Sequence, residues 1–250
     1  MAIAAPTVVR LERGYVRVTG PEAADFLERM LSNEVASLTV GEARQALLLT
    51  PKSRIVAPLR VVREGDDSFL LLTEAELAGA VAGNLLRARF AAKCEIEVQP
   101  LHGYLRLGPG EGIRNDDYGV EAFEGWSAEP VEASDPAELE PLRIQAATPA
   151  WGKELDDSVL PAEAGLETTH ISFTKGCYPG QEPVARLHHR GHPNRGLRVL
   201  VLENAQPGDE LIYEGKVVGR ITSAVPGRAL AYVRREVPEE ARLHLRPKRP

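Results

Sequence analysis

The sequence predicts an α+β protein that ends in a small β-barrel. Through residue 107, short stretches with every second residue apolar, as in strands, alternate with stretches whose apolar residues lie three and four apart, as in helices. After residue 191 the helical spacing disappears, and short strand-like stretches are separated by Pro-Gly and Glu-Gly turns. The 250 residues are enough for one large domain or two smaller ones.

The elements of the N-terminal region follow from this periodicity. We expect strands at residues 14–19, 43–50, 55–62 and 68–73, and the last three are expected to pair as an antiparallel meander because short polar turns join them. One helix is expected after Gly20-Pro21 and a second over residues 74–91. Strands at residues 94–98 and 104–107 complete a sheet with helices on one face.

The second half of the chain is expected to contain one more helix and the barrel. Residues 108–112 are glycine-rich but lack the spacing and the lysine of a phosphate-binding loop, so we expect a hairpin loop. A helix is expected over residues 135–146, and barrel strands at 197–202, 210–213, 217–222 and 230–233. The expected domains are therefore residues 1–192 and 193–250, with residues 246–250 as a tail.

Composition and charge indicate an ordinary globular protein. The net charge of −6 argues against a dedicated nucleic-acid binder, which is usually basic. The two cysteines, Cys94 and Cys177, suggest no disulfide framework, and Cys94 is expected to be buried at the start of a strand. The N-terminus lacks the features of a signal peptide and no run of about 18 apolar residues occurs, so we expect a cytoplasmic protein without a membrane span.

Residues 174–186 hold the densest group of special residues in the chain. Glycines there allow a backbone to approach a ligand closely. Cys177 has three possible roles: a nucleophile or redox thiol whose thiolate is favoured by Lys175 and Arg186, a ligand for a metal or cluster, or a packing residue. The pattern becomes helical from Glu182 onward, and Gly191 is expected to end that helix.

Histidines and arginines follow this group. A metal site formed by His188 and His192 is disfavoured because Gly191 and Pro193 interrupt the helix. A basic surface that binds an anionic partner is favoured instead, and it would consist of Arg186, Arg190, Arg195 and Arg198. The acid pairs Asp66-Asp67, Asp116-Asp117 and Asp156-Asp157 are expected to be solvated turns.

Residues 175–182 read Lys-Gly-Cys-Tyr-Pro-Gly-Gln-Glu and resemble the K-G-C-Y-x-G-Q-E signature of the folate-binding YgfZ family. Members of that family are relatives of the glycine-cleavage aminomethyltransferase that act in iron-sulfur protein maturation. Residues 171–173, 184–186, 190–191, 18–20, 26–27, 31–34 and 142–144 agree as well, so the resemblance covers most of the chain. It implies an aminomethyltransferase-like folate-binding fold that holds tetrahydrofolate, or a folate derivative, in a central cavity.

The resemblance also implies site residues. Cys177 is implied as the reactive residue, with Lys175 and Arg186 tuning it. The candidates for folate binding are Asn33, Arg143, Gln145, Trp151, Tyr178, Gln181 and Glu182. In the aminomethyltransferases the segment that matches residues 55–59 carries a catalytic aspartate, where this chain has Ala57 and Pro58, and Gln145 replaces a glutamate. Without these carboxylates, general acid-base catalysis of aminomethyl transfer has no obvious donor.

The leading hypothesis is a tetrahydrofolate-binding protein that assists the assembly or repair of iron-sulfur clusters in enzymes. Its partners would be iron-sulfur proteins or their assembly machinery. A first alternative is a folate-dependent aminomethyltransferase. A second alternative is a tRNA-modification accessory protein that contacts RNA through the basic surface from Arg186 to Arg198.

Overall fold

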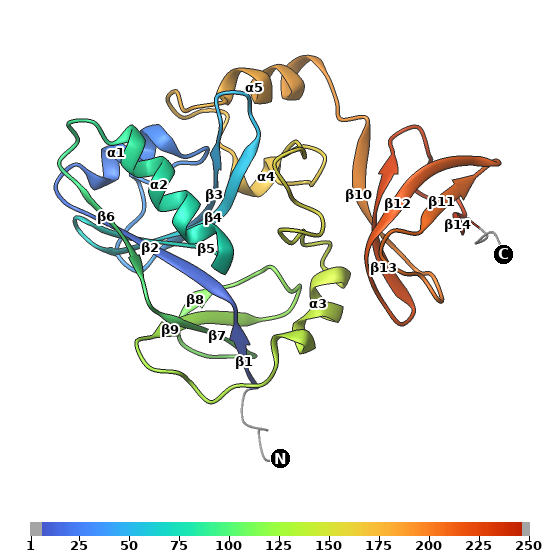
Figure 1. Ribbon diagram of the computed structural model, residues 1–250, viewed down its shortest axis with the longest axis horizontal. Helices are drawn as coiled ribbons and strands as arrows, with labels where there is room; N and C mark the ends of the chain where they lie inside the picture. The colour runs from blue at the N-terminus through green and yellow to red at the C-terminus, as the bar shows by residue number, and fades with distance from the viewer. Residues whose placement is uncertain (1–6, 247–250) are drawn as a thin grey trace.

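A computed structural model of the chain describes residues 7–246, which form three antiparallel sheets and the helices that cover them (Figure 1). The first sheet has the strand order β3-β4-β5-β2-β6. Its strands are β2 (Arg13–Thr19), β3 (Ala43–Leu49), β4 (Ile55–Gly65), β5 (Ser68–Glu74) and β6 (Glu95–Gln99). The expected meander of three strands is confirmed as β3-β4-β5.

Two helices cover one face of this sheet, α1 (Ala23–Met30) and α2 (Ala78–Ala88), as Figure 1 shows. Phe26 and Leu27 of α1 and Val81 and Leu85 of α2 are fully buried in one hydrophobic cluster with the strands. The members of these pairs lie one and four residues apart, and their burial places each pair on the sheet side of its helix. Burial of this stripe holds both helices on the sheet, because helices of this length are marginal alone.

The opposite face of the first sheet packs against a second sheet with the order β1-β7-β9-β8. Its strands are β1 (Val8–Leu11), β7 (His102–Leu107), β8 (Ile113–Arg114) and β9 (Ala122–Ser127). Tyr15, Leu70 and Leu72 meet Trp126 between the two sheets. The expectation of a hairpin at residues 108–112 is wrong, because β7 and β8 both pair with β9 and not with each other.

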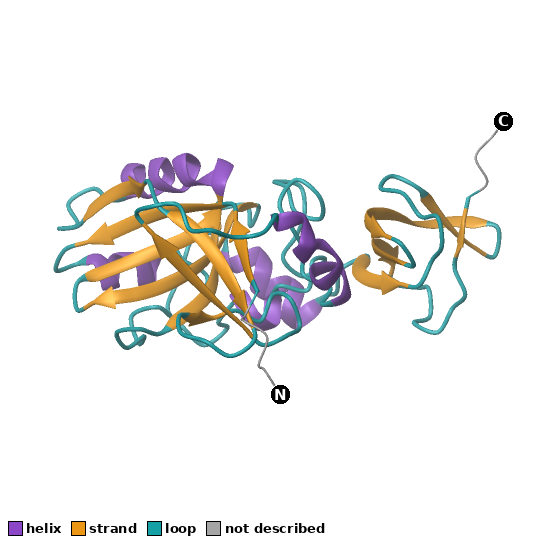
Figure 2. Ribbon diagram, turned by 90° about the horizontal axis from the view of Figure 1, so that it is seen from below, coloured by secondary structure: helices purple, strands orange, loops and turns teal. Residues whose placement is uncertain are grey.

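Short helices follow, and the chain ends in a third sheet. The helices are η2 (Pro136–Leu139), α3 (Glu140–Gln145), α4 (Glu167–His170) and α5 (Gln181–Arg190). The third sheet has the order β10-β13-β12-β11-β14 and its own hydrophobic core. Its strands are β10 (Arg195–Leu200), β11 (Glu210–Tyr213), β12 (Lys216–Val225), β13 (Arg228–Arg234) and β14 (His244–Leu245). Figure 2 shows this sheet at one end of the molecule, with the short helices and loops between it and the other two sheets.

The α+β prediction is confirmed, and the differences are local. Glu74 belongs to β5 rather than to the second helix, which starts with the 3-10 turn η1 (Ala75–Leu77) and ends at Ala88. Strand β9 was not expected, and its glycine has a packing role: a Cβ on Gly125 would lie 2.5 Å from the Tyr104 ring on β7. Residues 247–250 of the expected tail lie outside the described residues.

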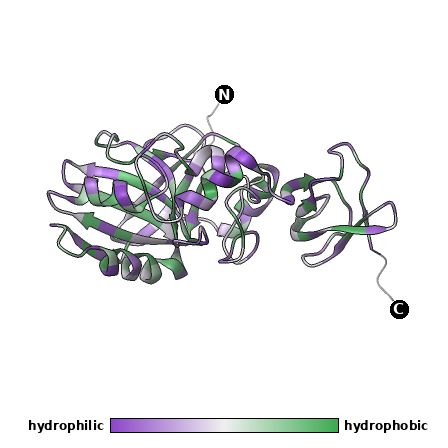
Figure 3. Cartoon of the chain, turned by 90° about the horizontal axis from the view of Figure 1, so that it is seen from above, coloured by the Kyte–Doolittle hydropathy of each residue, from purple (hydrophilic) through white to green (hydrophobic). Residues whose placement is uncertain are grey.

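Hydrophobic residues run along the strands of all three sheets, as Figure 3 shows. Cys94 is buried directly before β6, as expected. Within residues 7–246, no helix has both the length and the hydrophobicity needed to cross a bilayer.

Candidate functional site

The motif at residues 174–182 forms a loop that docks on the β3–β4 turn and leads into α5. Gly180 precedes the helix with φ of +82°, and a Cβ at that position would lie 2.4 Å from the carbonyl oxygen of Thr50. The Gly180 carbonyl also accepts a hydrogen bond from Ser53 Oγ. Tyr178 and Val184 are buried in a hydrophobic cluster with β3 and β4. Only glycine combines this backbone conformation with such a close approach.

Lys175 fixes the other end of the loop. Its side chain is 1% exposed, and Nζ lies 3.1 Å from Glu28 Oε1. Nζ also donates to the carbonyl oxygens of Glu28, Leu31 and Asn33 at 2.7, 2.9 and 2.8 Å, at the carboxyl end of α1. Burial lowers the pKa of Lys175 although Glu28 opposes the shift. The ammonium group therefore anchors the loop to α1, and its described contacts do not include Cys177.

The thiol of Cys177 is exposed at the tip of this loop. Arg186, on α5, donates to Glu182 at 2.7 Å one helical turn away, and both side chains are exposed. Gln181 accepts a hydrogen bond from the backbone N–H of Tyr178 at 3.4 Å. The structure therefore places Cys177, Arg186 and Glu182 on an open surface, whereas Tyr178 is packed inside and burial raises its pKa to about 12.

Asn33, Gln145 and Trp151 occupy three different surroundings. The Asn33 amide donates to the carbonyl oxygens of Gln45 and Thr169 at 2.9 and 3.0 Å and so joins β3 to α4. Trp151 packs between two hydrophobic clusters, and Gln145 is exposed at the end of α3. None of these three residues lines the cavity at the centre of the molecule, which is bounded by the first sheet, α3, α4 and β10. Their proposed contact with folate stays a prediction.

Arg143 is the predicted folate-binding residue that does line the cavity. Its guanidinium is saturated: Nε and Nη2 donate to the two oxygens of Glu140, and Nη1 donates to Glu154 Oε2 and to the Thr148 carbonyl. Nη2 also donates to Ser223 Oγ of β12 at 2.7 Å. Arg143 therefore links α3 to the third sheet across 80 residues of sequence.

The arginines expected to form a basic surface are mostly engaged. Arg195 pairs with Glu163 at 3.1 Å and lies over the ring of Tyr232. Arg198 donates to the carbonyls of Val237 and Pro238. His188 stacks on Phe173, with ring centres 3.8 Å apart. Among residues 7–246, no three His, Cys, Asp or Glu side chains are grouped closely enough to hold a metal ion.

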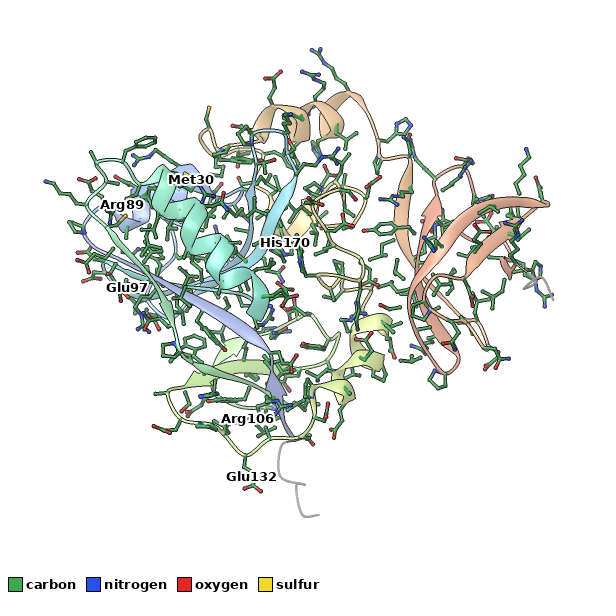
Figure 4. The ribbon with its side chains drawn as sticks, viewed as in Figure 1. Met30, Arg89, Glu97, Arg106, Glu132 and His170 are labelled. Atoms are coloured by element: carbon green, nitrogen blue, oxygen red, sulfur yellow. The ribbon has the colours of Figure 1, made fainter. Side chains whose placement is uncertain are left out.

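A cavity of about 690 Å³ lies at the centre of the molecule, between the first sheet, the loops around α3 and α4, and β10. Apolar side chains form much of its wall: Leu11, Pro58, Leu72, Leu139, Leu166 and Leu197. His170 of α4 also lines it, and Figure 4 shows this residue near the centre of the molecule. Burial lowers the pKa of His170 to about 4, so its imidazole is neutral at pH 7. A cavity of this size is typical of small-molecule sites.

Four charged side chains, two buried and two half-buried, form one side of the cavity and the layer beneath it. Arg13 Nε donates to Glu124 at 3.0 Å, and Arg60 Nη2 donates to Asp117 at 2.8 Å. Asp117 also accepts from Gln45, and Glu124 from Asn115, each at 2.8 Å. Burial alone would raise the pKa of Asp117, but Arg60 and Arg13 hold it below its ordinary value. The expectation that Asp116-Asp117 is a solvated turn is therefore wrong for Asp117.

Glu74, at the end of β5, is a further cavity-lining acid that sequence patterns did not indicate. Desolvation by burial raises its pKa. The prediction of a helix starting at residue 74 treated this residue as a favourable first-turn acid. A single glutamate at the end of a strand cannot be recognised as a cavity residue from the sequence, because the pairing of the strands decides whether its side chain faces the cavity.

Strand β4 contains Ala57 and Pro58, the two residues that stand where the aminomethyltransferases are expected to carry a catalytic aspartate. Ala57 is fully buried under the helices, whereas Pro58 lines the cavity. Successive residues of a strand point to opposite faces. The cavity-facing position of this segment therefore carries a pyrrolidine ring and no carboxylate.

The fold is that of the aminomethyltransferases. The glycine cleavage system aminomethyltransferase T from Bartonella henselae superposes with a TM-score of 0.79, covering 92% of this chain and 79% of that chain, with 21% identity. Residues 12–101, which contain the first sheet and its two helices, match the family described as the GCVT N-terminal domain.

Three relatives by sequence extend the comparison. The aminomethyltransferase of Streptomyces avermitilis is 28% identical over 285 residues, covering 88% of this chain and 76% of its own length. The mitochondrial iron-sulfur cluster assembly factor of Mus musculus is 29% identical over 243 residues, covering 80% of this chain and 68% of its own length. An uncharacterized protein of Haemophilus influenzae is 26% identical over 226 residues, covering 84% of this chain and 81% of its own length. The chain is thus similar both to aminomethyltransferases and to a cluster assembly factor.

Replacing Gly180 by alanine should destabilise the protein. The added Cβ meets the Thr50 carbonyl, and the left-handed backbone is strained for alanine, so we expect a loss of about 1–3 kcal/mol in the free energy of unfolding, measured with urea. Gly176→Ala, in the same loop, is the control, because a Cβ there meets nothing within 4 Å. Equal stability of the two variants would contradict the proposed docking of the loop.

Glu140→Gln should weaken the protein at neutral pH but not in acid. The hydrogen bond from Arg143 lowers the pKa of Glu140 to about 2, below its unfolded value. Its stabilisation is therefore present above about pH 4.5 and is lost as the pH falls toward 2. We expect a loss of about 1–3 kcal/mol at pH 7 in urea unfolding, shrinking between pH 4.5 and 3. Exposed Glu129→Gln is the control, and a loss independent of pH would contradict the ion pair.

Proposed function

We propose that this protein binds tetrahydrofolate, or a folate derivative, in the central cavity and assists the assembly or repair of iron-sulfur clusters in enzymes. The cavity is the observation that carries the proposal. Its volume of about 690 Å³ suits a ligand of this size, and its leucines and proline offer apolar surface for a planar ring. The aminomethyltransferase fold and the resemblance of residues 175–182 to the YgfZ signature support the same ligand.

The polar groups of the cavity also fit a folate. A pterin ring is planar and carries N–H donors and nitrogen and oxygen acceptors along its edges, which need a few fixed polar partners. Glu74, neutral His170 and the Arg60–Asp117 pair supply such partners among the apolar residues. Apolar walls with a small number of polar groups are the usual composition of cofactor sites.

Aminomethyl transfer is the competing function, and the similarity to the aminomethyltransferases favours it. The cavity-facing position on β4 argues against it, because Pro58 offers no carboxylate for general acid-base catalysis. Sustained aminomethyl transfer with lipoyl carrier protein as the partner would contradict our proposal.

The role in cluster assembly is supported by the position of Cys177 and by the similarity to the mouse assembly factor. The exposed thiol lies on a loop that Lys175 and Gly180 hold in place, so a partner protein can reach it. No residue of 174–191 lines the cavity, which separates the thiol from the proposed folate site. The partners would be iron-sulfur proteins or their assembly machinery, and the expected location is the cytoplasm.

Reduced folate should bind to the purified protein in calorimetry, and filling the cavity should weaken it. Gly196 lines the cavity and a Cβ there meets nothing within 4 Å, so Gly196→Leu adds a side chain without a collision at its base. We expect at least a tenfold loss of affinity, about 1.4 kcal/mol. Gly79→Leu, outside the cavity on α2, is the control. A flat titration of the unmodified protein across several folates would defeat the folate proposal.

Cys177→Ala should leave folding and folate affinity nearly unchanged while abolishing the activity of the protein in cells. The thiol is exposed, and substitutions of exposed side chains usually change stability little. The measurement is the recovery of iron-sulfur enzyme activities in cells that carry the variant as their sole copy. Cys94→Ala, which removes a buried thiol, serves as the control and should retain activity wherever it folds. Loss of folate binding by Cys177→Ala would instead assign the thiol to the ligand site.

A further inference from the structure

The charges that line the cavity are almost all neutralised within the protein. Arg13, Arg60 and Arg143 are each paired with carboxylates. Among the lining acids, Asp116, Asp117, Glu140 and Glu163 are paired with arginines. Within residues 7–246, the lining acids without an ion pair are Glu12, which is exposed, and Glu74, which is half-buried.

Glu74 is also short of hydrogen-bond donors. The described donors near its carboxylate are its own backbone N–H and the hydroxyl of Thr73, which lies 3.3 Å from Oε2. The Thr73 hydroxyl has a single hydrogen, and the Pro58 carbonyl competes for it at the shorter distance of 2.9 Å. The Glu74 side chain is half-buried, and burial raises the pKa of its carboxyl while the nearby positive charge of Arg13 opposes the shift. Such a group is satisfied when a ligand supplies N–H donors.

We propose that the Glu74 carboxylate recognises the pterin ring by accepting hydrogen bonds from its N3–H and 2-amino groups. This inference rests on the proposed binding of folate. The two donors lie side by side on one edge of the ring and match the two oxygens of a carboxylate, as in an arginine–carboxylate pair. Glu74 is therefore a specificity-determining residue for the pterin end of the ligand.

The same charge distribution offers no counter-charge to the rest of the ligand. The three arginines that line the cavity already have carboxylate partners, so none is free to pair with the negatively charged glutamate portion of a folate. The glutamate portion of the ligand therefore finds no free cation among the arginines that line the cavity, and the pterin edge is the part that Glu74 recognises.

The test is calorimetric binding of reduced folate and of its 2-desamino analogue, which lacks one of the two donors. The unmodified protein should prefer the folate by about 10- to 100-fold, the range for a hydrogen bond to a charged group. Glu74→Ala should lose a similar factor in affinity for folate and bind the two ligands almost equally. Glu12→Ala, which removes the exposed acid that also lines the cavity without an ion pair, is the matched control and should keep the full preference.

The free energy of unfolding of each variant shows whether a change in ligand affinity reflects a loss of folding. Because Glu74 is half-buried and burial disfavours its charged form, Glu74→Gln should fold at least as well as the unmodified protein and serves as the second variant. Full discrimination between the two ligands by folded Glu74→Ala or Glu74→Gln would overturn this inference and leave the folate proposal standing. Failure of the unmodified protein to bind any folate would overturn both. Aminomethyl transfer that disappears in Glu74→Gln would make Glu74 a catalytic residue and contradict the recognition role.

Discussion

Compensation of buried charge is the constraint on which the centre of this protein depends. Two ion pairs join the first sheet to the second. Arg13 on β2 pairs with Glu124 on β9, and Arg60 on β4 pairs with Asp117, which precedes β9. Glu124 is fully buried and lies 3.0 Å from Arg13 and 3.5 Å from Arg60, so the loss of either arginine would leave its charge less compensated in an apolar interior. These pairs therefore fix how the two sheets meet, and the cavity lies against that junction.

A second set of buried polar contacts brings the third sheet to the same cavity. Glu154 accepts hydrogen bonds from Arg143 and from Ser223 of β12, and its carbonyl accepts one from Tyr232 of β13. The start of β10 then contributes Gly196 and Leu197 to the cavity wall. The C-terminal sheet is thus part of the cavity wall as well as a unit with its own core, and its position follows from a few fully satisfied polar groups.

The cavity and the thiol are separate but connected. The segment that contributes Leu166, Thr169 and His170 to the cavity continues directly into the loop that carries Cys177. Ser32 joins the two regions, since its hydroxyl donates to the His170 carbonyl and its own carbonyl accepts from the Ser172 N–H. A ligand that contacts α4 can therefore influence the loop through backbone hydrogen bonds.

The sequence by itself determined the elements whose signals are local. Alternating apolar residues defined β2 to β5, the stripe of Phe26 and Leu27 defined α1, and Gly191 marked the end of α5. The motif around Cys177 was likewise visible as a run of unusual residues. The tertiary structure alone decided which charged residues share the cavity, because Arg13, Arg60, Asp117 and Glu74 come from distant segments. Asp117 belongs to an acid pair in a loop and Glu74 ends a strand, and both patterns are typical of solvated residues. Only the packing of the sheets places these two side chains in the cavity wall, partly out of contact with water.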